Sequence, residues 1–194
     1  KQALRVRARK MRLVADQKEG PVAAAAAASN LLSRLDEIGV RPGAVVAGYW
    51  PISTELDVRP LLARLEREGM VCALPAIEPG RDVLVFRRWH PGEPLVPGIF
   101  ETFQPPATAA EVVPEALLVP LLAVDRSGGR LGHGRGWYDR TLAALRRAAG
   151  ASSPRAIGVC FASQVIENVP CDSHDQPVDC ILTGDELICC VSRP

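Results

Sequence analysis

The sequence predicts an α/β protein whose single domain, residues 1–194, holds a largely parallel sheet flanked by helices. Short apolar runs alternate with amphipathic helical segments along the chain, which is the pattern of strands joined by crossover helices. The length of 194 residues, with 47% hydrophobic and 23% charged residues, suits one globular domain with a sizeable core.

Four segments have the features of helices. Residues 1–18 are basic and rich in helix formers, and residues 20–39 carry Pro21 near their start, followed by an alanine run. Residues 58–69 are amphipathic, and residues 138–150 directly follow a glycine-rich stretch. The glycines that end the second and third segments mark helix stops. We therefore expect four separate helices.

Six short apolar runs are expected to be strands. They span residues 44–50, 70–75, 83–89, 116–125, 155–161 and 178–183. The proline-rich stretch 90–116 is expected to be a long surface connection, and a loop of that length in a compact domain is more often functional than a linker.

Composition narrows the class of protein. The net charge of +1 does not favour a nucleic-acid partner. The six cysteines are scattered without a C-x-x-C pair, which is typical of reduced thiols in a cytosolic protein. No stretch is apolar enough to span a bilayer, and the basic start lacks the apolar run of a signal peptide. We therefore expect a cytoplasmic monomer that acts on a small molecule and binds neither nucleic acid nor membrane.

The glycine-rich stretch 127–140, SGGRLGHGRGWYDR, carries five glycines and three arginines between a predicted strand and a predicted helix. Glycine lets a backbone approach a ligand closely, and the N–H groups of a helix start suit phosphate. The stretch contains neither the Walker A pattern nor the early G-x-G-x-x-G of a dinucleotide-binding unit. It predicts an anion-binding loop, and the alternative is a turn whose arginines are solvated.

Several blocks together resemble one enzyme family. Residues 117–143, LLVPLLAVDRSGGRLGHGRGWYDRTLA, resemble the signature of the 5-formyltetrahydrofolate cyclo-ligase family, with its R-L-G-x-G-x-G-[YW]-Y-D-R core. Residues 46–62 resemble its Y-x-P-x-x-x-E-x-[DE] segment, residues 174–183 its late H-D-x-x-[VL]-D segment, and residues 1–12 its opening K-x-x-L-R helix. The blocks occur in family order and cover nearly the whole chain.

The resemblance implies ATP-dependent, Mg²⁺-dependent closure of 5-formyltetrahydrofolate to 5,10-methenyltetrahydrofolate, with release of ADP and phosphate. It also implies a fold similar to the sugar-phosphate isomerase and CoA-transferase group. Because a fold does not determine a function, two alternatives stay open. One is an ATP- or phosphosugar-handling enzyme of the same fold, and the other is a non-catalytic folate-binding relative.

The resemblance also implies an ATP site. Its members would be Lys1, Arg5, Arg130, Leu131, Gly132, His133, Gly134, Arg135, Gly136, Trp137 and Tyr138. Arg130 and Arg135 would be catalytic, because their charge would neutralise the phosphoryl group during transfer. Lys1 and Arg5 are spaced to share one helix face, although alone they would be read as a solvated basic helix. His133 is expected to make a surface contact within the loop.

Folate contacts are implied for Glu55, Phe100, Trp137 and Tyr138. Glu55 matches the family's folate-contacting glutamate, although alone it could be an ordinary first-turn glutamate. Trp137 stands where the family usually has a tyrosine, so it keeps a flat ring and loses a hydroxyl. Phe100 or the nearby Phe103 would cover the folate ring.

Asp139 and Asp175 match the acidic positions that the family uses around magnesium. Carboxylate oxygens suit this ion, which usually takes one or two protein carboxylates together with phosphates and waters. Without the resemblance, a helix-start aspartate and a turn aspartate would be read as structural.

Overall fold

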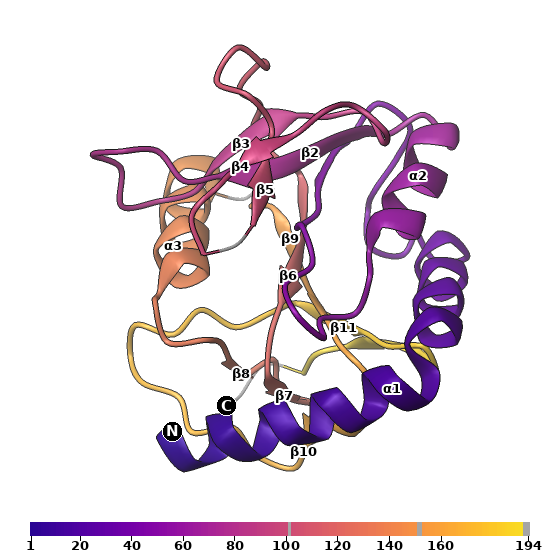
Figure 1. Cartoon of the computed structure of the whole chain (residues 1–194), viewed down its shortest axis with the longest axis vertical. Helices are drawn as coiled ribbons and strands as arrows, with labels where there is room; N and C mark the ends of the chain where they lie inside the picture. Colours follow the sequence, from indigo (N-terminus) through magenta and orange to yellow (C-terminus); the bar gives the residue numbers. More distant parts are fainter. Residues whose placement is uncertain (101, 151–152, 192–194) are drawn as a thin grey trace.

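The computed structural model describes residues 1–100, 102–150 and 153–191, and its centre is a twisted sheet (Figure 1). Over these ranges the main sheet has seven strands in the order β12-β11-β9-β6-β1-β2-β3. The strands are β1 Val45–Ala47, β2 Val71–Ala76, β3 Val85–Arg88, β6 Ala116–Pro120, β9 Arg155–Val159, β11 Cys180–Leu182 and β12 Leu187–Cys189. The inner five are parallel, and the edge strands β3 and β12 pair antiparallel. The predicted fold class is confirmed, whereas the likeness to sugar-phosphate isomerases stays a prediction.

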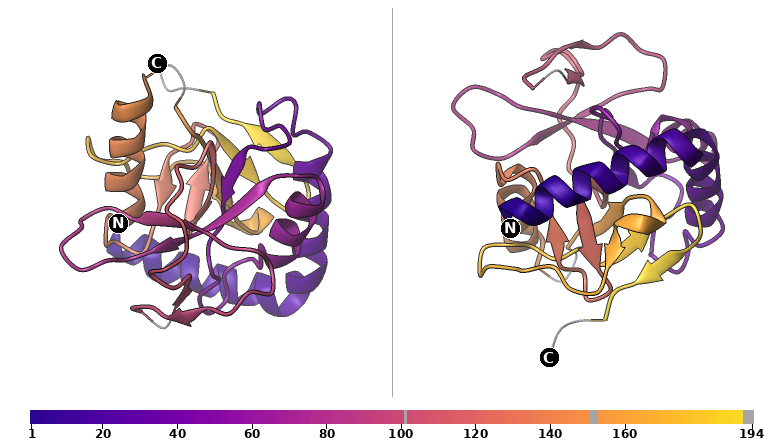
Figure 2. Two further views of the ribbon diagram at one scale, coloured as in Figure 1. Left: turned by 90° about the horizontal axis from the view of Figure 1, so that it is seen from above. Right: turned by 60° about the horizontal axis from the view of Figure 1, so that its bottom comes forward.

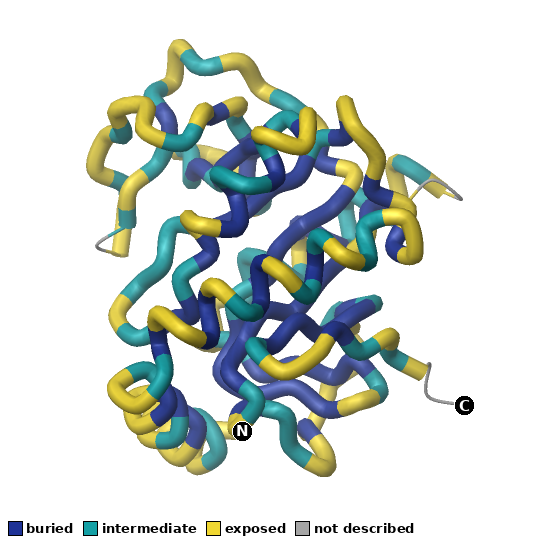
Figure 3. The backbone as a smooth tube through the Cα atoms, turned by 90° about the vertical axis from the view of Figure 1, so that its right-hand side faces the viewer, coloured by how far each residue is buried: buried dark blue, intermediate teal, exposed yellow. Residues whose placement is uncertain are grey.

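Helices cover both faces of the sheet (Figure 1). They are α1 Gln2–Leu32, α2 Arg59–Arg67 and α3 Trp137–Ala149. Strand residues such as Val46 and Leu118 pack in one core with α1 and α2, whereas their neighbours Ala47 and Leu117 pack in a second core with Leu142 of α3. This alternation follows from the two-residue period of a strand, and it places the most deeply buried chain in the middle of the molecule (Figure 3).

The expectation of two separate helices over residues 1–18 and 20–39 was wrong. Helix α1 runs through Pro21, ends at Leu32 and is followed by turns up to Gly39. A proline inside a helix removes one hydrogen bond and kinks the axis, and α1 bends midway along its length (Figure 1). The helix continues past the bend because its alanine-rich second half is buried in the core on α2.

The expected strand 116–125 is divided between two sheets. After β6 the chain enters β7, Ala123–Asp125, which belongs to a three-stranded sheet with β8, Arg130–Leu131, and β10, Val165–Ile166. A 3-10 turn, η2 Ala162–Gln164, precedes β10. The first half of α1 crosses this small sheet, and Ala8 packs there (Figure 2).

The proline-rich stretch 90–116 is largely the expected irregular connection. It also contains a short antiparallel pair, β4 Val96–Pro97 and β5 Phe103–Gln104, which the apolar pattern did not predict. Strand β12 was not predicted either, because its three residues are too short to give a periodic signal. Over the described residues, no helix combines the length and the apolar character that crossing a bilayer requires.

Candidate active site

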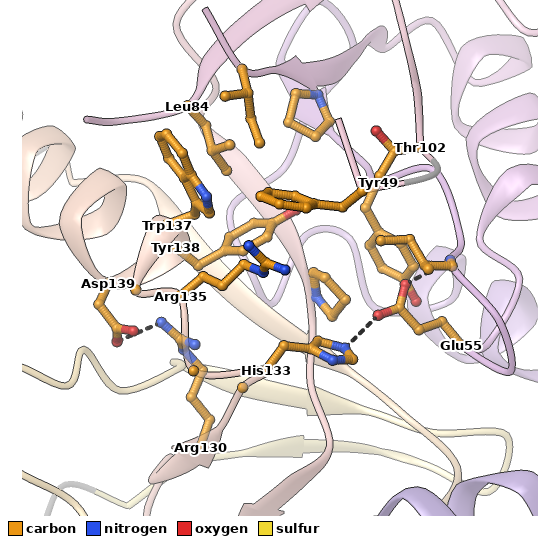
Figure 4. A pocket seen from close by; sticks show the side chains of 18 of the residues that line it. Tyr49, Glu55, Leu84, Thr102, Arg130, His133, Arg135, Trp137, Tyr138 and Asp139 are labelled. Carbon is orange, nitrogen blue, oxygen red and sulfur yellow. Dashed lines mark hydrogen bonds and ion pairs between the residues drawn. The ribbon is translucent and has the colours of Figure 1, made fainter. Parts of the chain in front are cut away.

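A cavity of about 450 Å³ lies beyond the carboxyl ends of β1, β2 and β6 (Figure 4). Ligands of open α/β sheets bind at this end of the strands. Its walls come from the start of α1, the segment after β1, the 90–116 connection, and the glycine-rich loop between β8 and α3. All the residues implied by the family resemblance line it: Lys1, Arg5, Glu55, Phe100, Arg130, Leu131, Gly132, His133, Gly134, Arg135, Gly136, Trp137, Tyr138, Asp139 and Asp175.

The glycine-rich loop leads into the N-terminus of α3, which has no side-chain cap among the described residues. Gly136 is the residue before α3 and has a φ of 71°, and Gly134 has a φ of 96°, values that favour glycine. Among the described residues, no side chain caps the first turn of α3. The N–H groups of that turn therefore remain available to an anion or to water.

Arg130 is a buried cation next to this helix start. Its side chain is 4% exposed, and Nη2 donates to Oδ1 of Asp139 over 2.7 Å. Burial lowers the pKa of the guanidinium, and the charges of Asp139 and Asp175 oppose that shift. Its Nε is buried without a hydrogen-bond partner among the described residues. A buried donor without a partner is costly, and Arg130 also lines the cavity, so a bound acceptor that reached this N–H would remove that cost.

Arg135 differs from Arg130 in its surroundings. It is exposed, and its guanidinium carbon lies 3.5 Å from the ring centre of Phe100. Phe100 has a φ of 61°, which is unusual for a residue other than glycine and is often found at ligand sites. This stacked pair joins the glycine-rich loop to the 90–116 connection across the cavity.

The start of α1 contacts the glycine-rich loop directly. Arg5 Nε donates to the carbonyl oxygen of Gly132 over 3.1 Å. A β-carbon at Gly134 would lie 3.1 Å from the guanidinium carbon of Arg5, so only glycine lets the loop approach this closely. Lys1 Nζ lies 2.7 Å from Oδ2 of Asp172 and 2.6 Å from Oδ2 of Asp175. Both predicted cations of α1 therefore reach the cavity.

A buried charge cluster connects α1 to the loop. The Glu55 side chain is 3% exposed, and its Oε1 lies 3.4 Å from Nη1 of Arg12 and 3.1 Å from Nε2 of His133. Burial lowers the pKa of Arg12, while the charge of Glu55 opposes that shift. Sequence reasoning missed Arg12, although it lies seven residues after Arg5 and so on the same helix face. It also did not predict the partner of His133.

The two predicted metal-binding aspartates are neighbours. The backbone N–H of Gln176, the residue after Asp175, donates to Oδ1 of Asp139 over 2.9 Å. Burial would raise the pKa of Asp175, but hydrogen bonds from Lys1 and from the N–H of Asp172 outweigh it, so the pKa is lowered. Within the described ranges, no group of three or more His, Cys, Asp or Glu residues could hold a metal ion. A cation here would need ligands from a bound molecule or water as well.

Aromatic side chains complete the cavity wall. Trp137 and Tyr138, at the start of α3, line it together with Trp50 and Phe103. Trp50 and Phe103 pack edge to face with ring centres 5.8 Å apart. Flat rings in the wall suit a planar ligand such as a fused heterocycle.

The comparisons with known proteins agree with one another. The model of the 5-formyltetrahydrofolate cyclo-ligase family matches residues 1–184. The 5-formyltetrahydrofolate cyclo-ligase of Escherichia coli (strain K12) is 32% identical over 147 residues, which are 73% of this chain and 79% of that protein. The enzyme of the same name from Haemophilus influenzae is 30% identical over 155 residues, or 77% of this chain and 81% of that protein.

Solved structures agree with these matches. The 5,10-methenyltetrahydrofolate synthetase of Aquifex aeolicus superposes with a TM-score of 0.78 at 27% identity, over 100% of this chain and 94% of that one. A synthetase from Mycoplasma pneumoniae, with a TM-score of 0.71 and 20% identity over 94% and 98% of the two chains, shares the fold. The chain belongs to the 5-formyltetrahydrofolate cyclo-ligase family of enzymes.

Proposed function

We propose that the protein closes 5-formyltetrahydrofolate to 5,10-methenyltetrahydrofolate and uses ATP to drive the closure. The observation that carries the proposal is one cavity lined by four cations, an uncapped helix start and several aromatic rings. The cations and the helix start suit a triphosphate, and the rings suit a pterin. Membership of the family is the reason to propose that these two substrates bind together.

ATP would bind along the glycine-rich loop. The phosphates would accept hydrogen bonds from the first turn of α3, and the unpartnered Nε of Arg130 offers a further donor. Lys1 and Arg5 would contact the phosphates from α1, on the opposite side of the loop. Arg135, exposed on the loop, would leave its stacked contact with Phe100 to reach the phosphoryl group as it transfers.

Magnesium would be held by Asp139 and Asp175 together with phosphate oxygens and water. The donor set fits this ion, because each carboxylate uses one oxygen in the protein contacts described above and has a second oxygen to offer. Such an ion supplies charge neutralisation at the phosphates. Arg130 orients Asp139 through its hydrogen bond, and Lys1 orients Asp175 and contributes to its lowered pKa.

Folate would bind against the aromatic rings that line the cavity. Glu55 would accept hydrogen bonds from the N–H groups of the pterin, while Trp137 and Tyr138 supply flat contact surfaces. Phe100 would cover the ring from the 90–116 connection. Tyr138 stays neutral in this role, because burial raises the pKa of its hydroxyl.

The chemistry needs activation of a poor leaving group. The formyl oxygen would attack the γ-phosphorus of ATP and release ADP. N10 would then attack the activated carbon and lose its proton to solvent, and phosphate would leave with the former formyl oxygen. Positioning and charge neutralisation account for such a reaction without a protein nucleophile. Arg130 and Arg135 would stabilise the negative charge that passes from ATP to the departing phosphate.

The experiment is to measure ADP release and the absorbance of the methenyl product with ATP and 5-formyltetrahydrofolate, each supplied alone and then together. We expect both signals only when both substrates are present, in a ratio of one to one. ATP hydrolysis independent of folate, or folate binding without product, would contradict the proposed reaction. Arg135→Ala should lower kcat far more than it weakens folate binding, because its charge is needed most in the transition state.

A further inference from the structure

Glu55 is held firmly without any help from the glycine-rich loop. Its Oε2 accepts a hydrogen bond of 3.0 Å from the N–H of Ile52, in the same segment after β1. Its Oε1 faces the guanidinium of Arg12, which is itself 4% exposed and donates through Nε to Thr54. One of these partners is the buried Arg12 and the other is a backbone N–H of the same segment, so both hold the carboxylate independently of the loop.

His133 is a different kind of partner for Glu55. Its side chain is 36% exposed, and the residue lies between Gly132 and Gly134 in the loop. Its Nε2 reaches Oε1 of Glu55 across the cavity, as Figure 4 shows. Among the described residues, Oε1 of Glu55 has two side-chain partners, and of these His133 lines the cavity whereas Arg12 does not. The carboxylate is only 3% exposed, so a ligand donor that approaches Oε1 from the cavity meets the imidazole.

We propose that His133 occupies the folate-facing oxygen of Glu55 in the empty site and that 5-formyltetrahydrofolate displaces it on binding. The inference rests on the proposed function, because it takes Glu55 as the folate acceptor. His133 then sets the affinity for folate by competition, and its displacement frees the loop that carries the nucleotide contacts. The flanking glycines make such a movement possible at little steric cost.

The test compares folate binding in the full-length protein without ATP, by titration calorimetry with 5-formyltetrahydrofolate. His133→Ala removes the competitor, and we expect a dissociation constant roughly two- to tenfold lower, the range that one hydrogen bond spans. His133→Gln keeps an N–H donor for Oε1 of Glu55, so its folate affinity should stay near the wild-type value.

His90→Ala is the matched control. His90 makes the same kind of contact, from Nδ1 to Oε1 of Glu66 over 2.5 Å, but outside the cavity. It should leave folate affinity unchanged. Unchanged or weaker folate binding in His133→Ala, with a melting temperature like that of the wild type, would overturn the competition. Failure of the wild type itself to bind folate would instead overturn the proposed function, and the displacement with it.

Discussion

Replacing Asp139 by asparagine tests whether its carboxylate compensates the buried charge of Arg130 beside the proposed phosphate site. Asp139 is the ion-pair partner of Arg130, whose side chain is 4% exposed, and the aspartate itself is 23% exposed. Asparagine preserves the shape of the side chain and keeps an acceptor oxygen for the 2.7 Å contact. The substitution therefore removes the negative charge and little else.

The expected cost follows from these contacts. Removing one partner of a buried ion pair costs about 3–5 kcal/mol, because a buried charge loses its compensation. Here the amide oxygen retains roughly half of the charge-assisted hydrogen bond, and the carboxylate of Asp175 still acts on Arg130. We expect the free energy of unfolding to fall by about 2–3 kcal/mol, which lowers the melting temperature of a chain of this size by roughly 4–12 °C.

The assay is urea unfolding followed by tryptophan fluorescence, together with a magnesium titration of ATP binding at a temperature where the variant is folded. Glu186→Gln is the control, since it neutralises the carboxylate of an exposed pair with Arg126, and such pairs contribute under about 1 kcal/mol. Weaker magnesium-dependent ATP binding is expected for Asp139→Asn alone. An unfolding midpoint equal to that of the control would refute the claim that Asp139 compensates a buried charge, and unchanged magnesium dependence would remove Asp139 from the metal site.

Two further predictions concern the rest of the chain. Gly128→Ala should destabilise the protein by at least about 2 kcal/mol in urea, because its φ is 86° and a β-carbon there would collide with the carbonyl oxygen of Val178. Gly39→Ala, with a φ of 73° and open space around it, should cost only about 1 kcal/mol, and equal losses would contradict the collision. In the folded protein at pH 8, a maleimide should label the exposed thiols Cys171 and Cys189, as peptide mass spectrometry can establish. Burial raises the pKa of the other four thiols, so rapid labelling of any of these before unfolding would contradict the packing described.

Local pattern was enough to predict the class of fold and the position of the loop. The apolar runs of the inner parallel strands could be located because strands buried on both faces need continuous apolar residues. The glycines and arginines of residues 127–140 were recognisable because a phosphate-binding turn needs a bare backbone and nearby cations. Short elements such as β12 and the β4–β5 pair escaped prediction, because two or three residues carry no periodic signal.

What the chain itself determined about the site is the kind of residue at each position: a lysine and an arginine four apart on α1, a glutamate after β1, and a histidine within the glycine-rich loop. Tertiary structure alone decided which of them meet. Arg12, Glu55 and His133 lie 43 and 78 residues apart along the chain, yet they share one carboxylate oxygen. Such contacts depend on the path of α1, which bends at Pro21 and crosses the small sheet, and local propensity does not encode that path. Arg130 needs Asp139 because its charge is buried, and that burial likewise arises only when β8, α3 and α1 pack around the same cavity.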